Sequence, residues 1–489
     1  MEYVGIDLGT SNSNIAWSDG KSSQIIEMAD GSRALPSVIT FDDDDNPLVG
    51  TAAVNAAVIT PTRSYRHVKR LVGQKWNDAE NSGGQTVEGP DGSVWLRGPD
   101  KNYSPTQFQA VIIDALLNAA ENKFGKRPQK AVLTVPAAWK TPQRDAAKGA
   151  ALMAGLTDVT LLPEPNAAAI AYGVGRKKFS TIAVYDWGGG TFDFSIIRAK
   201  GSAIEEVGTS GNAKLGGKDV DEIIVRHVLR VWHERYGTDL GVRNDTMPRI
   251  RTAAEATKIE LTGLPKSAVK VDFVDSSGPD SVKHMNEPIT KDQFEEMAMA
   301  TVMQTFGPVE QVMKDCGIAK GDIDEIILVG GMTRVPMVRQ LVADFFGKEP
   351  KKGISPEEVV ALGAATYAAQ LAGRGGDEAF SLSGKAPHSL SLETLNNERF
   401  MVIQKGTPLP AKRVVQLTTS VDNAAVVGIH LLEGDDEFGR ADELTLLCRD
   451  YPEVEPSVAG EPTVEIVIER DESGGVRVTH NDRVIYEAA

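Results

Sequence analysis

The N-terminal part of the chain contains one short pattern twice, at residues 4–13 and at residues 183–193. In each copy an apolar, strand-like run ends at an aspartate, which is Asp7 in the first copy and Asp186 in the second. A glycine-containing turn with a hydroxyl residue follows, and then a second strand-like run begins. A duplicated unit of this kind predicts two similar halves that face each other across a cleft.

Strand and helix patterns alternate over about the first 370 residues. Short apolar runs are typical of buried strands. Thr141, with Pro142 at the first helical position, and Ser355 are predicted to cap two helices that reach Gly155 and about Ala372. The alternation predicts an α/β domain with parallel strands. The predicted strands lie at residues 3–6, 131–135, 181–185 and 326–329.

The chain changes character after Gly373. Residues 374–384 begin with a polar, glycine-rich stretch, and we expect them to form a linker between a first domain at residues 1–373 and a second at residues 385–489. The second domain consists of alternating apolar and polar runs separated by turn residues, which is typical of an all-β sandwich. Its predicted strands include residues 414–419, 425–432, 443–447, 463–469 and 476–478.

Composition excludes several classes of protein. The chain has 489 residues and a net charge of −16, which argues against broad binding to nucleic-acid backbones. No run approaches the roughly 18 apolar residues of a membrane span, and the start does not resemble a signal peptide. Cys316 and Cys448 suggest neither a disulfide framework nor a zinc site. We therefore expect a cytoplasmic protein that binds neither nucleic acid nor membranes.

The two duplicated turns have the composition of phosphate-binding loops. Glycine lets the backbone approach an anion closely, and successive backbone N–H groups can then surround it. Asp7 and Asp186, at the strand ends, could hold a metal ion through water. The alternative is a pair of ordinary hairpin turns, which two matching copies make less plausible. The residues concerned are Gly9, Thr10, Ser11 and Asn12 in the first turn, and Gly188, Gly189, Gly190 and Thr191 in the second.

Two further segments are candidates for binding the rest of a nucleotide. Gly330 and Gly331 follow a buried strand and precede a helix, so the backbone there can approach a flat ring or a sugar. The segment 251–261 is predicted to be helical, with one face that could clamp a nucleoside. A tight strand-to-helix turn and a solvated charged helix face are the respective alternatives. The helix face consists of Glu255, Lys258, Ile259 and Thr262.

Together these motifs resemble the seventy-kilodalton heat-shock chaperones of the DnaK type. The resemblance runs from Val4 to about Asp482. It implies two actin-like lobes around an ATP cleft, followed by a linker and a β-sandwich that binds extended peptides. The motifs that carry it are residues 5–10, 134–137, 164–165 with 167–169, 186–193 and 328–331.

The resemblance also implies roles for single residues. Lys69 corresponds to the lysine that contacts the γ-phosphate and the attacking water, and Glu164 to the carboxylate that orients magnesium-bound water. Asp7, Asp186 and Asp193 correspond to a cage for Mg²⁺ and K⁺, mainly through water. The implied catalytic set is Lys69, Glu164, Asp193, Thr191 and Asp7, and the nucleotide site further includes Gly216, Gly217, Met332 and Arg334.

Other implied positions concern coupling and peptide binding. Pro136 and Arg144 match a proline switch and its relay arginine. Phe380 and Leu382 alternate with serines, so one face of the linker is expected to dock on the ATP domain when ATP is bound. The implied partners are client peptides and a nucleotide-exchange factor, and the cofactors are ATP or ADP, Mg²⁺ and K⁺. The implied peptide-binding positions are Arg399, Met401, Leu417, Ser420 and Val427.

The sequence departs from the family pattern at several positions. Trp187 replaces a leucine, Pro163 replaces an asparagine, and Thr160 replaces an arginine used for J-protein contact. The linker also lacks the family's run of leucines. These changes predict weak stimulation by a general J-domain protein, and thus a dedicated J-domain partner or none. The helical lid has no counterpart, so the chain resembles a short form, either natural or cut before the lid.

The sequence therefore predicts an ATP-hydrolysing chaperone in which ATP binding loosens peptide binding and hydrolysis tightens it. Two other functions share the actin-like plan. A small-molecule kinase would need a substrate-activating aspartate in the cleft, and an actin-like protein would form filaments. Neither has a use for the β-sandwich.

Overall fold

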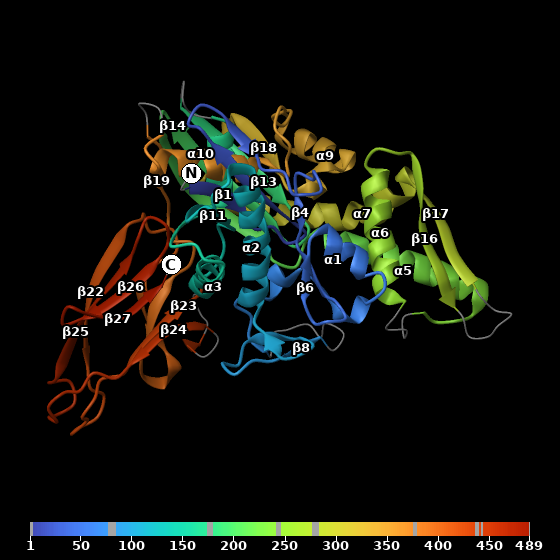
Figure 1. Cartoon of the computed structure of the whole chain (residues 1–489). Helices are drawn as coiled ribbons and strands as arrows, with labels where there is room; N and C mark the ends of the chain where they lie inside the picture. Colours follow the sequence, from blue (N-terminus) through green and yellow to red (C-terminus); the bar gives the residue numbers. More distant parts are fainter. Residues whose placement is uncertain are drawn as a thin grey trace.

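The computed structural model describes residues 3–76, 85–173, 179–240, 246–275, 283–374, 379–435, 440–441 and 444–488. Figure 1 shows a large α/β region and, beside it at the lower left, an all-β region formed by the C-terminal part of the chain. Residues 375–378 of the predicted linker and Glu443 of a predicted strand lie outside the described residues.

The first lobe is built on a sheet with the strand order β12-β11-β1-β2-β3. β1 (Tyr3–Asp7) is parallel to β11 (Lys130–Val135), which is parallel to β12 (Asp158–Pro163). β1 also forms an antiparallel hairpin with β2 (Asn12–Ser18), and β3 (Ser23–Ile25) follows. Helices α2 (Pro105–Phe124) and α3 (Thr141–Met153) contribute to the same hydrophobic core.

The second lobe repeats this plan with the strand order β18-β13-β14-β15-β19. β13 (Ser180–Trp187) is parallel to β18 (Glu325–Val329) and forms a hairpin with β14 (Phe192–Lys200). β15 (Ala203–Asn212) and β19 (Ser381–Ser383) complete the sheet. Between the two sheets pack α4 (Glu164–Ala171) and α10 (Val359–Leu371). Each duplicated sequence pattern therefore forms the central hairpin of one lobe.

Each lobe contains further elements besides those named above. Those of the first lobe are β4 (Leu35–Pro36), β5 (Val38–Phe41), β6 (Pro47–Val49), α1 (Thr51–Ala56), β7 (Ser64–Arg66), β8 (Thr86–Glu88), β9 (Val94–Arg97) and β10 (Asn102–Tyr103). Those of the second lobe are α5 (Gly217–Tyr236), α6 (Met247–Leu261), β16 (Lys266–Asp275), β17 (Lys283–Thr290), α7 (Lys291–Gln304), α8 (Phe306–Cys316) and α9 (Pro336–Phe346).

The C-terminal region consists of two four-stranded antiparallel sheets that share one apolar core. This core forms because alternate residues of each strand are buried, as in β25, where Val464, Ile466 and Ile468 point inward. One sheet contains β21 (Arg399–Ile403), β20 (Leu390–Glu393), β23 (Ile429–Glu433) and β24 (Thr445–Asp450). The other contains β22 (Ala411–Thr418), β25 (Thr463–Arg470), β26 (Val476–His480) and β27 (Arg483–Ala488).

Several predicted element boundaries are wrong. The helix expected to reach Gly155 ends at Met153, and the strands expected at residues 414–419 and 443–447 are Ala411–Thr418 and Thr445–Asp450. The helix expected from Ser355 begins at Val359. The Pro356 carbonyl accepts a hydrogen bond from the Gly330 N–H and therefore is not used for a helical hydrogen bond. The N-cap of α3 is Lys140 and not Thr141. The N–H and the hydroxyl of Thr141 instead donate hydrogen bonds to Glu433 of the β-sandwich. The strand expected at residues 425–432 begins only at Ile429.

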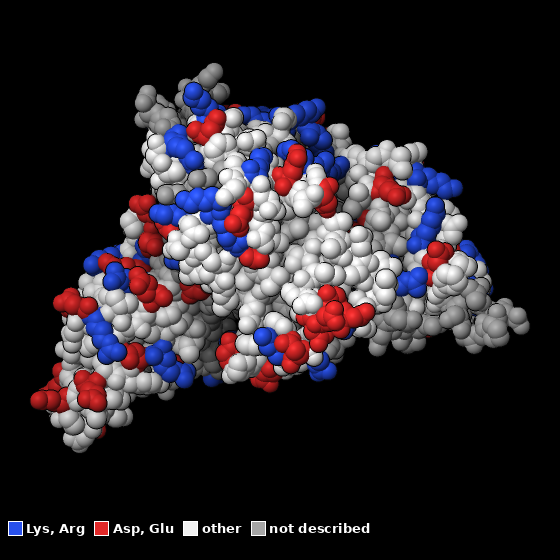
Figure 2. Space-filling view, viewed as in Figure 1, with Lys and Arg blue, Asp and Glu red and all other residues white. Residues whose placement is uncertain are grey.

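The sequence argues against binding to membranes and to nucleic acid, and two properties of the structure concern these partners. In the described part of the chain no helix is both long enough and apolar enough to cross a membrane. Figure 2 shows acidic and basic side chains interspersed over the visible face of the β-sandwich, so that neither sign forms a continuous patch there.

Candidate functional site

The two glycine-containing turns meet at the centre of the molecule, one from each lobe. A methyl group added to Gly190 would lie 2.5 Å from Oγ1 of Thr10, and one added to Gly189 would lie 2.0 Å from Oγ of Ser11. No larger residue fits at either position without movement, so the turns approach each other as closely as glycine allows. The structure therefore brings the predicted phosphate loops of the two lobes together.

Four carboxylates gather behind these turns. Asp7 ends β1, Asp186 and Asp193 lie on the β13–β14 hairpin, and Glu164 begins α4. Burial, reinforced by the charge of Glu164, raises the pKa of Asp7 and of Asp193 to about 7 each. The pKa of Asp186 is raised by the same two causes. These carboxylates repel one another strongly enough that a bound cation would stabilise the group.

Lys69 lies among these carboxylates. It belongs to the short 3-10 helix Val68–Leu71, and its Nζ donates a hydrogen bond to Oε1 of Glu164 at 3.0 Å. Burial alone would lower the pKa of Lys69, but the negative charges of Glu164 and Asp7 outweigh the effect of burial. The pKa of Lys69 is therefore raised above its usual value. The ring of Trp139 lies 5.2 Å from Nζ. A charged ammonium group is thus fixed among the carboxylates that lie behind the predicted phosphate loops.

The donor set fits the magnesium ion that the resemblance implies. Mg²⁺ prefers oxygen ligands and keeps several of its waters, and the site offers carboxylates whose mutual repulsion a cation relieves. Among the described residues, no group of three or more His, Cys, Asp or Glu side chains is placed to hold a metal ion directly. Water molecules would therefore have to complete the coordination.

The residues predicted to bind the nucleoside come together only in part. Lys258 is buried on α6, where its Nζ lies 2.8 Å from Asp221 and donates to the Gly217 carbonyl. A methyl group at Gly217 would touch both Lys258 and Met332, so these three residues adjoin one another. They could line one wall of a nucleoside pocket.

The other members of this set make separate contacts. Glu255 faces Arg66 of the first lobe at 3.7 Å. Ile259 is 59% exposed, and the Thr262 hydroxyl donates to its carbonyl. Arg334 binds Glu357. Gly331 adjoins the Glu357 carboxylate, Gly216 the second turn, and Gly330 the Trp187 carbonyl.

Arg70, which the sequence analysis did not single out, connects the two lobes. Its Nε donates to the Gly190 carbonyl at 2.8 Å, and its Nη2 donates to Asp219 at the start of α5 at 2.6 Å. Its side chain is largely buried. Arg70 thus holds the second phosphate loop from the opposite lobe. Its place directly after Lys69 was the one available signal, since no spacing pattern links it to Asp219.

The comparison with protein-family models decides the identity of this fold. The model described as Hsp70 protein matches residues 3–487. The chain belongs to the Hsp70 family. Hsp70 proteins are ATP-dependent chaperones, and membership implies nucleotide binding with Mg²⁺ and binding of unfolded client peptides.

In this Hsp70 protein the residues expected to carry signals lie where the two domains meet. Arg144 is buried on α3 and donates hydrogen bonds to the carbonyls of Trp139, Ala137 and Ser473. The first two carbonyls follow Pro136 in the same loop, whereas Ser473 belongs to the β-sandwich. Arg144 therefore joins the Pro136 loop to the second domain.

The linker continues the sheet of the second lobe. β19 runs parallel to β15, with Leu382 opposite Ile204. Phe380 is buried in the hydrophobic core between the lobes, and Leu382 packs against this core from a half-buried position. The intervening Ser381 is exposed. The described part of the linker is thus docked along one face.

A buried ion pair forms a second connection, which the sequence analysis did not predict. Glu433 and Arg470 are both fully buried and lie 2.7 Å apart. The Glu433 carboxylate also accepts hydrogen bonds from the N–H of Thr141 at 2.8 Å and from its hydroxyl. A carboxylate is favourable at a helix N-terminus, so Glu433 ties the β-sandwich to the start of α3.

The positions predicted to bind peptide are spread over the β-sandwich. Val427 is buried and Leu417 half-buried against the sandwich core, whereas Ser420 is exposed. Arg399 and Met401 are half-buried on β21. Among the described residues the Nη1 and Nη2 atoms of Arg399 have no hydrogen-bond partner. Large apolar side chains that are exposed on this domain include Leu395, Phe400, Val421 and Tyr451.

Proposed function

We propose that this Hsp70 protein hydrolyses ATP in the cleft between its two lobes and uses the reaction to control the binding and release of extended apolar peptides. The observation that carries the proposal is the hydrogen bond from Lys69 to Glu164 within a group of buried carboxylates, next to two facing glycine-containing turns. In this setting the Lys69 ammonium group could contact an attacking water molecule, and the Glu164 carboxylate could orient it.

The reaction is phosphoryl transfer to water, in which the protein mainly positions groups and neutralises charge. The backbone of the two glycine-containing turns would hold the phosphates, with the hydroxyls of Thr10 and Thr191 as further donors. Lys69 would contact the γ-phosphate and the attacking water, and Glu164 would orient that water. When bound, Mg²⁺ supplies charge neutralisation on the phosphate oxygens. Asp7, Asp186 and Asp193 would hold it through water, and we propose K⁺ as a second ion there.

Coupling to peptide binding would run through two of the connections between the domains. Arg144 donates hydrogen bonds to the Ala137 carbonyl, in the loop after Pro136, and to the Ser473 carbonyl of the β-sandwich. β19 occupies the sheet edge next to β15. A change in lobe closure would alter both contacts, and with them the peptide site, for which we propose Arg399, Met401, Leu417, Ser420 and Val427. Two sites linked in this way must affect each other's affinity equally.

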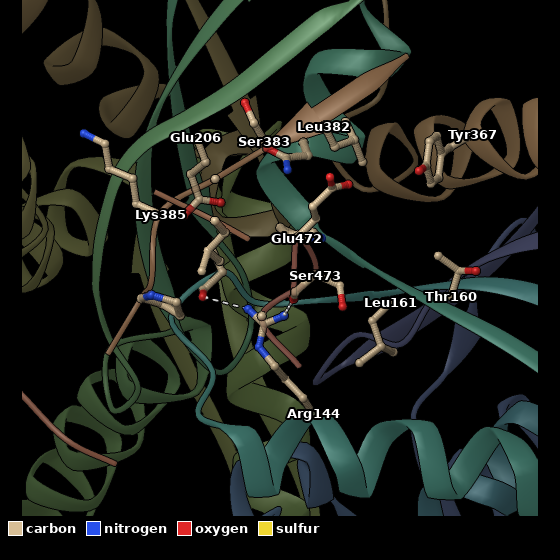
Figure 3. A pocket seen from close by; sticks show the side chains of 17 residues that line it. Arg144, Thr160, Leu161, Glu206, Tyr367, Leu382, Ser383, Lys385, Glu472 and Ser473 are labelled. Atoms are coloured by element: carbon tan, nitrogen blue, oxygen red, sulfur yellow. Dashed lines mark hydrogen bonds between the residues drawn. The ribbon is translucent and has the colours of Figure 1, made fainter. Parts of the chain in front are cut away.

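Partners are proposed on the same basis. Extended, apolar segments of unfolded proteins would be the clients, and a nucleotide-exchange factor would open the cleft. Thr160 lies on β12 and lines a cavity beside the linker (Figure 3). Because a neutral residue stands at this J-protein contact position, we propose a dedicated J-domain partner, or none, rather than a general one. We also propose that the protein acts in the cytoplasm.

Phosphate release without any added acceptor tests the enzymatic part of the proposal. We expect slow, Mg²⁺-dependent release of phosphate from ATP by the full chain, with no change in sedimentation. A dependence on an added small-molecule acceptor would instead indicate a kinase of the same superfamily. ATP-dependent sedimentation as large polymers would indicate a filament protein.

A further inference from the structure

Two hydrogen bonds join a carboxylate, an imidazole and a phenol on the surface of the β-sandwich. Nδ1 of His430 lies 2.6 Å from Oε2 of Glu393, and Nε2 of the same ring lies 3.0 Å from the hydroxyl oxygen of Tyr451. Glu393 ends β20, His430 lies on β23, and Tyr451 directly follows β24. Three neighbouring strands of one sheet therefore bring these side chains together.

The strand register places the carboxylate and the imidazole on the outer face of this sheet. Leu392 pairs with Leu431, which pairs with Cys448, and all three side chains belong to the buried core. Successive residues of a strand point to opposite faces. Glu393 and His430, which are next to Leu392 and Leu431 in the sequence, therefore point away from the core.

Tyr451 is held in place by its own segment, but its phenol stays accessible. The N–H of Val427 donates a hydrogen bond to the carbonyl of Pro452 at 3.0 Å. A methyl group at Gly428 would lie 3.8 Å from Cε1 of Tyr451, so the ring lies beside this glycine. Tyr451 is 49% exposed, whereas the side chain of His430 is only 23% exposed. A reagent in solution can thus reach the phenol, while the imidazole behind it is mostly covered.

The hydrogen-bonding partners determine where the protons of the neutral imidazole lie. An ionised carboxylate only accepts hydrogen bonds, so Nδ1 of His430 carries the hydrogen and donates it to Glu393. Nε2 then has a free lone pair, and the hydroxyl of Tyr451 donates to it. A carboxylate that orients an imidazole, which in turn accepts a proton from a hydroxyl group, is the arrangement that activates hydroxyl nucleophiles.

We propose that Tyr451 is a nucleophile that accepts an acyl group from an activated ester, with His430 as its general base and Glu393 as a positioning residue. The Tyr451 oxygen attacks the carbonyl carbon while its proton passes to Nε2 of His430. The bond from that carbon to the leaving oxygen then breaks, and the leaving group takes the electron pair and the proton. Tyr451 keeps the acyl group as an aryl ester. The step uses none of the residues of the nucleotide cleft.

The charges around the phenol favour a neutral acyl donor over a phosphate. Glu393 belongs to the hydrogen-bonded chain, and Asp450 and Glu453 are close to Tyr451 in the sequence. These carboxylates would repel a phosphate group. Arg449 pairs with His430 across the ladder, so it adds one positive charge to the same face. That charge favours the carbonyl oxygen, which becomes negative during the attack.

Reaction of the full chain with p-nitrophenyl acetate tests the site, with the acetyl adduct at each tyrosine followed over time by mass spectrometry of the peptides. The internal reference is Tyr236, which is 38% exposed and has no histidine partner at its hydroxyl among the described residues. We expect Tyr451 to be acetylated roughly tenfold faster than Tyr236 or more, because a general base typically contributes about 10²–10⁴-fold.

Variants of the β-sandwich separate the roles of the two supporting residues. His430→Gln can keep a hydrogen bond to Glu393 but supplies no base, so acetylation of Tyr451 should slow roughly tenfold or more. His480→Gln removes another histidine of the same domain and should leave the rate within about twofold, since His480 is not in the chain of hydrogen bonds that provides the base. Glu393→Gln should slow the reaction severalfold, and Glu393→Asp, which restores a carboxylate, should recover part of the loss.

Three results would overturn the proposal. The first is acetylation of Tyr451 no faster than that of Tyr236. The second is a parent-like rate at Tyr451 in His430→Gln, folded as judged by its thermal transition. The third is a rate in Glu393→Asp no higher than in Glu393→Gln, which would show that the carboxylate does not orient the base.

Discussion

Charged groups are buried in two regions of this molecule, and they are treated differently. In the cleft, Asp7, Asp186, Asp193 and Glu164 surround Lys69, which offsets their repulsion only in part, since the pKa of each aspartate stays raised. At the domain junction Glu433 meets Arg470 and the N–H of Thr141. The first arrangement needs a ligand to be balanced, whereas the second is complete within the protein.

This contrast indicates two kinds of role for buried charge. A group with excess negative charge binds cations, and through these cations it can bind a polyphosphate. A neutralised pair adds no such affinity, but it fixes one geometry between the parts that carry it, because any other arrangement leaves a charge unpaired. We therefore expect changes in the cleft to alter catalysis and changes at the junction to alter stability and docking.

The largest effect is expected at the junction. Arg470→Met leaves the Glu433 carboxylate buried with only the N–H and hydroxyl of Thr141 as donors, and losing one partner of a buried pair costs about 3–5 kcal/mol. The free energy of unfolding of the β-sandwich, measured by urea denaturation, should fall by that amount.

A matched double variant sharpens this test. Glu433→Leu combined with Arg470→Met removes both charges and should recover most of the lost stability, because apolar replacements of a buried pair are often neutral. The contact to Thr141 would still be lost. A single variant as stable as the parent to within about 1 kcal/mol would show that the pair is not the balanced unit described above.

In the cleft, Lys69→Ala should reduce single-turnover ATP hydrolysis by roughly 10²–10³-fold, the usual cost of losing one preorganised charge contact. ATP affinity should change by less than about threefold, since the two glycine-containing turns remain. The exposed Lys126→Ala is the control for loss of a positive charge. A Lys69→Ala rate within threefold of the parent would remove Lys69 from the mechanism.

The lobe-bridging Arg70 should have a smaller effect, of a different kind. Arg70→Ala frees the Gly190 carbonyl and Asp219, and hydrogen bonds to charged groups contribute about 1.5–3 kcal/mol. We expect KM for ATP to rise roughly 10–100-fold through faster nucleotide dissociation, with kcat reduced less than KM is raised. Arg70→Lys should restore only part of the affinity, because one ammonium group does not reproduce the two-sided contact. An unchanged dissociation rate in Arg70→Ala would contradict the positioning role.

The linker is expected to show the smallest effect, confined to coupling. Phe380 is part of the core between the lobes, so an aspartate there would damage the fold, and Leu382 is the better position. Leu382→Asp should undock β19 and reduce the acceleration of peptide release by ATP severalfold, while basal hydrolysis persists. Ser381→Asp, on the exposed side of the same strand, is the control. Acceleration equal to the parent's in Leu382→Asp would show that linker docking does not transmit the signal.

The parts of the fold that the sequence predicted are those in which a pattern repeats. The aspartate-and-glycine motif occurs twice, and both copies form the central hairpin of a sheet, so the facing turns could be expected. Alternating apolar residues at 463–469 likewise predicted a sandwich strand with one buried face. Membership of the Hsp70 family confirms the resemblance on which the site assignments rest.

The parts that escaped prediction are contacts between side chains far apart in the sequence. Glu433 ends an apolar strand and Arg470 ends another, and nothing in either neighbourhood indicates that the two pair. Arg70 and Asp219 show no local signal for the same reason. At Ser355 a capping sequence was overridden by a tertiary contact, the hydrogen bond from Gly330 to the Pro356 carbonyl. Local patterns thus predicted elements and motifs, but not the charged contacts that join the domains.

The most direct test of the account compares the affinity of the full chain for a short apolar peptide in the presence of Mg²⁺·ATP and of Mg²⁺·ADP, measured by fluorescence anisotropy. Coupling between two sites of a protein is typically about 1–3 kcal/mol, or roughly 5–150-fold. We expect the peptide to bind that much more weakly with ATP than with ADP. Equal affinities with the two nucleotides would contradict the claim that the cleft controls the β-sandwich.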